Sequence, residues 1–109
     1  MRHALPLAFL LALGGAAHAQ TAEGVAHACR FQLALQSGSK PANEEEARSQ
    51  GSYCRATIRH VIQRQCPQAK IDENAAIQQV VSYLEQRPDR ARDPADKVLP
   101  EALAGQGCR

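Results

Sequence analysis

The chain has 109 residues, with 13 Lys and Arg side chains against 11 Asp and Glu, four cysteines and no tryptophan. This length fits one domain, and a formal net charge of +2 gives no case for a nucleic-acid or anionic-membrane partner. A core of this size with few aromatic side chains is only marginally stable by itself, so cross-links are expected.

The N-terminus has the three parts of an export signal. Arg2 supplies a positive charge, residues 4–13 are nearly all apolar, and Ala17-His18-Ala19 matches a signal-peptidase cleavage site. The apolar run is too short to span a bilayer, which takes about 20 apolar residues. We expect residues 1–19 to be a cleaved signal peptide. Residues 20–109 then form one mature domain, which lies in the periplasm and is not held in the membrane.

Helical periodicity dominates the rest of the chain, with almost no pattern typical of strands. Apolar side chains recur at helical spacing over residues 21–35, and again over residues 44–65. Asn43 is a typical N-cap for the second of these helices. Cys66-Pro67 ends that helix, because the residue before a proline avoids the helical region.

Two further helices are predicted. Asp72 begins the third helix as its N-cap, and Pro88 stops it. We expect Asp93 to cap a fourth helix with Pro94 at its first position, and a kink or a 3₁₀-like turn at Pro100. The sequence thus predicts an all-α fold, a small disulfide-stapled four-helix bundle after a cleaved signal peptide.

The four cysteines can pair in three ways. If the first two helices form an antiparallel hairpin, Cys29 and Cys54 lie level with one another across it. In an up-down bundle the ends of the second and fourth helices share one pole, which brings Cys66 near Cys108. We therefore expect the pairs Cys29–Cys54 and Cys66–Cys108, each contributing about 3–4 kcal/mol through chain entropy.

Other chemical signals in the sequence are weak. The two histidines after residue 19, His27 and His60, do not stand at zinc-ligand spacing with the cysteines, so disulfides are favoured over zinc. No haem, redox, nucleotide or hydrolase motif is present, and an even number of cysteines leaves no free thiol. We therefore expect no enzymatic activity, no cofactor and no bound metal.

Arginines form two candidate groups. Arg55 and Arg59 lie one turn apart on the polar side of the second helix, which we interpret first as a solvated face and second as a binding patch. The link over residues 86–92 carries three arginines and is stiffened by Pro88. Its two interpretations are a solvated turn and a rigid finger whose guanidinium groups bind carboxylates of a partner.

Several segments of residues 20–109 carry a recognisable pattern. In chain order they are Gly51-Ser52-Tyr53-Cys54-Arg55-Ala56-Thr57-Ile58, Cys66-Pro67, Val80-Val81-Ser82-Tyr83-Leu84-Glu85-Gln86-Arg87-Pro88 and Ala102-Leu103. Together they resemble the Rap/Tai family of small periplasmic immunity proteins. The resemblance extends over nearly the whole of residues 20–109 and rests on the cysteine order and on a tyrosine-leucine-proline stretch. Departures from the family pattern are Ala56-Thr57 in place of Gly-Tyr, His60 in place of a small residue, and Gly107 in place of a proline.

The resemblance implies an all-α inhibitor. Characterised members protect bacteria from peptidoglycan amidases delivered by type VI secretion, which they bind in the periplasm, often as homodimers. In that family a loop between helices enters the amidase cleft, which makes Arg87, Pro88 and Arg90 the expected partner-binding residues, with Arg55 and Arg59 as the second choice. The alternative function is a periplasmic stress chaperone or holdase, or another small periplasmic binding protein.

Overall fold

The computed structural model describes residues 20–108, and these residues form an all-α fold with two disulfide bridges. The predicted fold class is confirmed. The predicted signal peptide, residues 1–19, lies outside the described residues. The elements are α2 (Ala22–Gln36), α3 (Glu44–Gln65), α4 (Glu73–Gln86) and α5 (Ala95–Ala102), with two 3₁₀ turns, η1 (Pro88–Arg90) and η2 (Ala104–Gln106).

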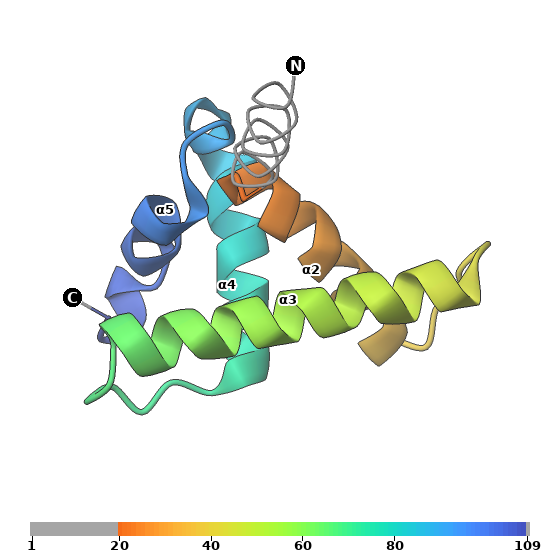
Figure 1. The fold of residues 1–109 in the computed structure, drawn as a ribbon, viewed down its shortest axis with the longest axis horizontal. Helices are drawn as coiled ribbons and strands as arrows, with labels where there is room; N and C mark the ends of the chain where they lie inside the picture. The colour runs from red at the N-terminus through yellow and green to blue at the C-terminus, as the bar shows by residue number, and fades with distance from the viewer. Residues whose placement is uncertain (1–19, 109) are drawn as a thin grey trace, which may run out of the picture.

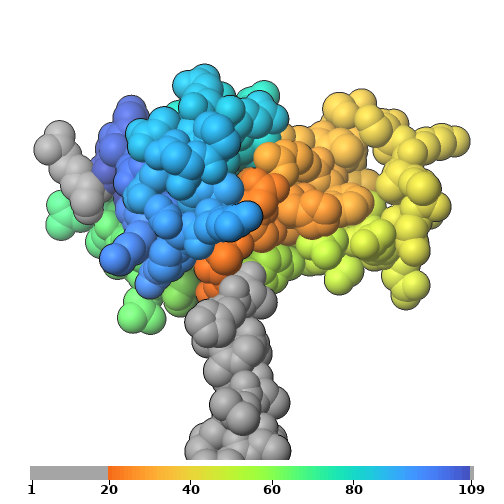
Figure 2. All heavy atoms as spheres, turned by 90° about the horizontal axis from the view of Figure 1, so that it is seen from above, coloured from red at the N-terminus to blue at the C-terminus, as the bar shows by residue number. Residues whose placement is uncertain are grey.

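The long helix α3 crosses α4, with α2 and α5 placed on the two sides of α4 (Figure 1). Together they enclose an aliphatic core that includes Val25, Ile58, Ile77 and Leu99, all fully buried. The hairpin end of α2 and α3 projects beyond the other helices (Figures 1 and 2). Within residues 20–108, no helix is long and apolar enough to cross a membrane.

The helix starts follow from side-chain caps. The Asn43 carboxamide oxygen accepts a hydrogen bond from the Glu46 backbone N–H at 3.0 Å, and the Asp72 carboxylate accepts one from Ala75 at 2.9 Å. Each cap satisfies a backbone donor that has no partner inside its helix. Both predicted caps are therefore confirmed.

The predicted cap at Asp93 is wrong. Helix α5 begins at Ala95 with Pro94 in the cap position, and no side chain caps it. The Asp93 carboxylate instead forms an ion pair with Arg90, while its backbone oxygen accepts from the Ala22 N–H at 2.9 Å. A charged partner binds a carboxylate more strongly than a backbone N–H does, so Asp93 is used outside the helix.

Pro100 lies inside the α-helix α5, so the 3₁₀ turn that was one of two expectations at this residue is not found there; a 3₁₀ turn follows later, at η2. A proline has no N–H to donate to the carbonyl four residues earlier, which belongs to Asp96. The Gln65 side-chain amide of α3 donates to that carbonyl at 3.3 Å. A side chain from another helix thus replaces the missing backbone bond.

Both expected disulfides are confirmed. Cys29 joins Cys54 between α2 and α3, with 4.9 Å between their Cα atoms, and Cys66 joins Cys108 with 4.8 Å. Cys29, Cys54 and Cys108 are fully buried and Cys66 is nearly so. Disulfides persist in oxidising compartments, so the two bridges fit an extracellular or periplasmic protein.

Gly51 lets α2 and α3 approach closely beside the first bridge. A Cβ atom at this position would lie 2.5 Å from the Gln32 side-chain oxygen and 3.4 Å from a Leu35 methyl group. A methyl group would require the end of the Gln32 side chain to move, and a larger side chain would press against α2, so a small residue here suits the close contact of the two helices.

Candidate partner-binding surfaces

The link between α4 and α5 holds its arginines in ion pairs. Arg87 forms a fork with the Asp89 carboxylate two residues later, at 3.1 and 2.9 Å. The hydrogen bond to Asp89 raises the pKa of Arg87, and the same bond lowers the pKa of Asp89. Pro88 opens the short turn η1 that brings these two side chains together. The pair is exposed to solvent.

Arg90 is anchored more extensively than Arg87. Its guanidinium donates to the Glu101 carboxylate of α5 at 3.0 and 2.7 Å and also pairs with Asp93. The Tyr83 hydroxyl of α4 donates to the same Glu101 carboxylate. The bonds from Arg90 and then Tyr83 lower the pKa of Glu101, and the bond to Glu101 raises the pKa of Tyr83. Arg90 therefore ties η1 to α5.

The second predicted group lies at the other end of α4. Arg59 forms a fork with the Glu73 carboxylate at 2.9 and 3.3 Å, while Arg55 reaches the same carboxylate only through its Nε atom, at 3.4 Å. The hydrogen bond from Arg59 is the main cause that lowers the pKa of Glu73 and raises that of Arg59. Arg59 is thus the principal partner of Glu73, and Arg55 is weakly paired.

The two groups of arginines do not form one surface. Glu73 begins α4, and the residues of the link follow its last residue, Gln86. The helix from Glu73 to Gln86 is 14 residues long, a rise of about 20 Å between the two groups of arginines. The structure brings together Arg55 with Arg59, and Arg87 with Pro88 and Arg90, but each group stays at its own end of α4.

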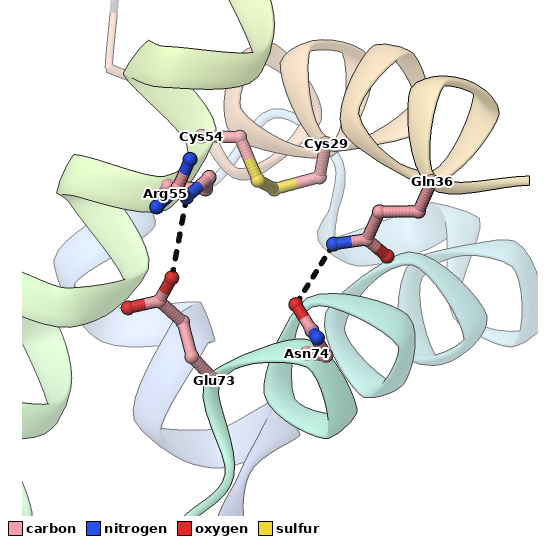
Figure 3. Close-up of a disulfide and its surroundings, with 6 residues drawn as sticks. All are labelled: Cys29, Gln36, Cys54, Arg55, Glu73 and Asn74. Carbon is pink, nitrogen blue, oxygen red and sulfur yellow. Dashed lines mark hydrogen bonds and ion pairs between the residues drawn. A yellow bond between two sulfur atoms is a disulfide. The ribbon is translucent and has the colours of Figure 1, made fainter. Parts of the chain in front are cut away.

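A hollow of about 340 Å³ lies between α2 and α3 beside Arg55. Figure 3 shows Arg55 and Gln36 on opposite sides of the Cys29–Cys54 bridge, each held by a residue of α4. The Gln36 amide donates to the Asn74 side-chain oxygen at 2.8 Å. The lining consists of three side chains from each helix, namely Gln32, Leu35, Gln36, Arg48, Ser52 and Arg55.

Two larger open hollows, of about 670 and 610 Å³, lie side by side between α2 and α4. They share Leu33, Ala75 and Gln78, and they are lined mainly by apolar and uncharged side chains, with acidic residues at Asp72 and Glu85. Within residues 20–108, no group of three or more His, Cys, Asp and Glu side chains is placed to hold a metal ion.

Sequence reasoning missed several residues of these surfaces. Glu73 and Glu101 accept hydrogen bonds from the arginines, and Tyr83 donates to Glu101, but the bonded residues are 11 to 18 residues apart in the chain. Arg48 and Ser52 could have been found beside the predicted Arg55, because residues three and four apart share one helix face. The sequence prediction names Arg55 and Arg59 but neither Arg48 nor Ser52, so it does not include the hollow.

No family model matches the chain, and neither a curated protein nor a solved structure matches it.

Proposed function

We propose that this protein is a periplasmic immunity protein, which binds and inhibits a peptidoglycan amidase delivered by type VI secretion. The sequence resemblance to the Rap/Tai family suggests the class of partner, and the observation that supports the proposal is a small helical scaffold fixed by two buried disulfides, with arginines held in ion pairs on its surface. A surface ordered before binding loses little conformational entropy in the complex, which favours tight association with one partner.

The charged groups also favour recognition over catalysis. Among residues 20–108, the groups whose pKa is clearly raised or lowered all belong to an ion-pair or hydrogen-bond cluster at one end of α4 or the other. Such clusters hold the side chains in fixed orientations and give the surface a fixed pattern of charge that a partner protein can recognise. We therefore propose a binding protein without its own enzymatic activity, cofactor or metal, and with the capacity to form a homodimer.

The function is tested by capture from periplasm with the tagged, disulfide-bonded protein, followed by mass spectrometry of the bound proteins. We expect one stoichiometric partner that degrades peptidoglycan and loses that activity in the complex. Weak binding to many unfolded proteins, without a stoichiometric partner, would contradict immunity and support the holdase alternative. Peptidoglycan hydrolysis by the purified protein itself would contradict the proposal as well.

A further inference from the structure

The hollow between α2 and α3 has the chemistry of a carboxylate-binding site. Its lining presents two guanidinium groups, from Arg48 and Arg55, together with the Ser52 hydroxyl and two side-chain amides. A guanidinium group has five N–H donors in a planar fork, which matches the two oxygens of a carboxylate. No acidic side chain lines this hollow.

Arg55 keeps donors available for a ligand. Its contact with Glu73 uses Nε alone, at 3.4 Å, and its two terminal nitrogens donate to no other side chain within residues 20–108. Among the described residues, Arg48 is paired only with Glu44, one turn earlier, through a single bond of 3.0 Å between two well-exposed side chains. Exposed pairs of this kind contribute little free energy, so Arg48 can exchange partners at small cost.

The local charge favours an anion. Arg55 and Arg59 share one carboxylate, that of Glu73, so this cluster carries an unbalanced positive charge beside the hollow. The link at the other end of α4 is different, because Arg87 and Arg90 face three carboxylates, from Asp89, Asp93 and Glu101. An acidic group of a partner therefore has a more favourable electrostatic interaction at the hollow than at the link.

The walls of the hollow are held in place before any ligand binds. Cys29–Cys54 joins the two helices, and Gly51 allows their close approach. Asn74 of α4 holds Gln36 through a hydrogen bond between the two side chains (Figure 3). A ligand that enters a hollow with fixed walls orders few further side chains, so little conformational entropy is lost on binding.

We propose that this hollow receives an aspartate or glutamate side chain of the protein partner, with Arg55 as the main anchor and Arg48 as the second. The inference rests on the proposed function, since it names the surface and the chemistry through which the partner is bound.

The chemistry of the hollow can be tested without the partner, using N-acetyl-aspartate as the probe and the arginine Nε–Hε resonances as the signal. We expect a saturable shift of the Arg55 resonance and none for Arg64, an exposed arginine further along α3. Arg55→Gln should abolish the accompanying shifts of the Ser52 amide, whereas Arg64→Gln should preserve them.

Glu73→Gln provides the most specific variant for this test. It removes the negative charge that competes with the probe for Arg55, so the probe should bind about fivefold more tightly, as expected for one charge acting across a partly solvated pair. Absence of a saturable Arg55 shift, or weaker binding to Glu73→Gln, would overturn the proposal.

The second test measures binding of the partner protein captured from periplasm. Arg55→Gln should weaken the complex about thirtyfold, as for other anchoring arginines. An unchanged complex would overturn the assignment to a partner carboxylate even if the probe binds. If capture recovers no amidase, the immunity function fails, and the probe experiment by itself decides whether the hollow binds carboxylates.

Discussion

Two pairs of arginines sit at opposite ends of α4 and differ in how completely they are neutralised. Arg87 and Arg90 face three carboxylates in the link to α5, whereas Arg55 and Arg59 share only Glu73. The first group has the exposed, proline-stiffened position expected of a binding finger. The second lies along the face of a helix, beside a hollow.

This difference shows that an arginine can bind a partner only through those guanidinium N–H groups that the fold has not already paired. Arg90 has structural partners on α5, so a new ion pair with another protein would require an existing one to break. Over residues 20–108, Arg55 has a single, long side-chain contact to lose. The arginines of the link thus mainly hold the link to α5, and the α3 face is better suited to recognition.

The largest expected effect comes from removing the bridge beside the α3 face. Cys29→Ser with Cys54→Ser opens a loop of 25 residues and should lower the free energy of unfolding by about 3.5 kcal/mol. Urea denaturation measures the loss. The matched control, Cys66→Ser with Cys108→Ser, should cost a similar amount but leave the Arg55 resonance in place. Equal changes of the Arg55 resonance in both variants would contradict the claim that the first bridge holds the hollow in place.

A smaller loss of stability is expected when the spacing of α2 and α3 is changed. Gly51→Leu introduces atoms where even a Cβ would lie 2.5 Å from Gln32, and overpacking of this kind costs about 2 kcal/mol. Gly51→Ala is the control, because the Gln32 side chain can move away and alanine favours the helix by about 1 kcal/mol. Thermal unfolding should therefore separate the two variants clearly. A Gly51→Leu protein as stable as Gly51→Ala would show that close helix contact does not shape this surface.

Acid should weaken both ends of α4. The pKa of Glu101 is lowered mainly by its bond from Arg90, and that of Glu73 mainly by its bond from Arg59. A carboxyl whose pKa is lower in the folded state stabilises the fold above its ordinary value, 4.5 here, and this stability is lost as pH falls through the folded pKa. Urea midpoints between about pH 7 and about pH 3 measure the loss. Glu101→Gln and Glu73→Gln should each flatten that dependence, whereas Glu85→Gln, at an exposed glutamate without an ion pair in residues 20–108, should retain it.

The smallest effect is expected for Arg87→Ala. Although the bond to Asp89 raises the pKa of Arg87 strongly, the two side chains are half exposed or more, so solvent screens the pair. The melting temperature should be unchanged within error, while that of Arg90→Ala should fall because Glu101 and Asp93 lose their common partner. Equal destabilisation by the two variants would contradict the distinction drawn between the local pair and the anchored one.

The sequence predicted those parts of the molecule that depend on neighbours along the chain. The caps at Asn43 and Asp72 follow from a side chain and a backbone N–H three residues apart. The cysteine pairs follow from an antiparallel arrangement of the helices. The partners of Arg55 and Arg90 could not be predicted, because they depend on how α4 packs against α3 and α5. Asp93 was misassigned for the same reason, since its competing partners become visible only in the folded chain.

The measurement that tests the central claim most directly is titration calorimetry of the captured amidase with three proteins: the native protein, Arg55→Gln and Arg87→Gln. We expect about thirtyfold weaker binding for Arg55→Gln, as for an anchoring arginine, and native affinity for Arg87→Gln. Native affinity for Arg55→Gln together with a loss for Arg87→Gln would contradict the account and place the partner at the α4–α5 link.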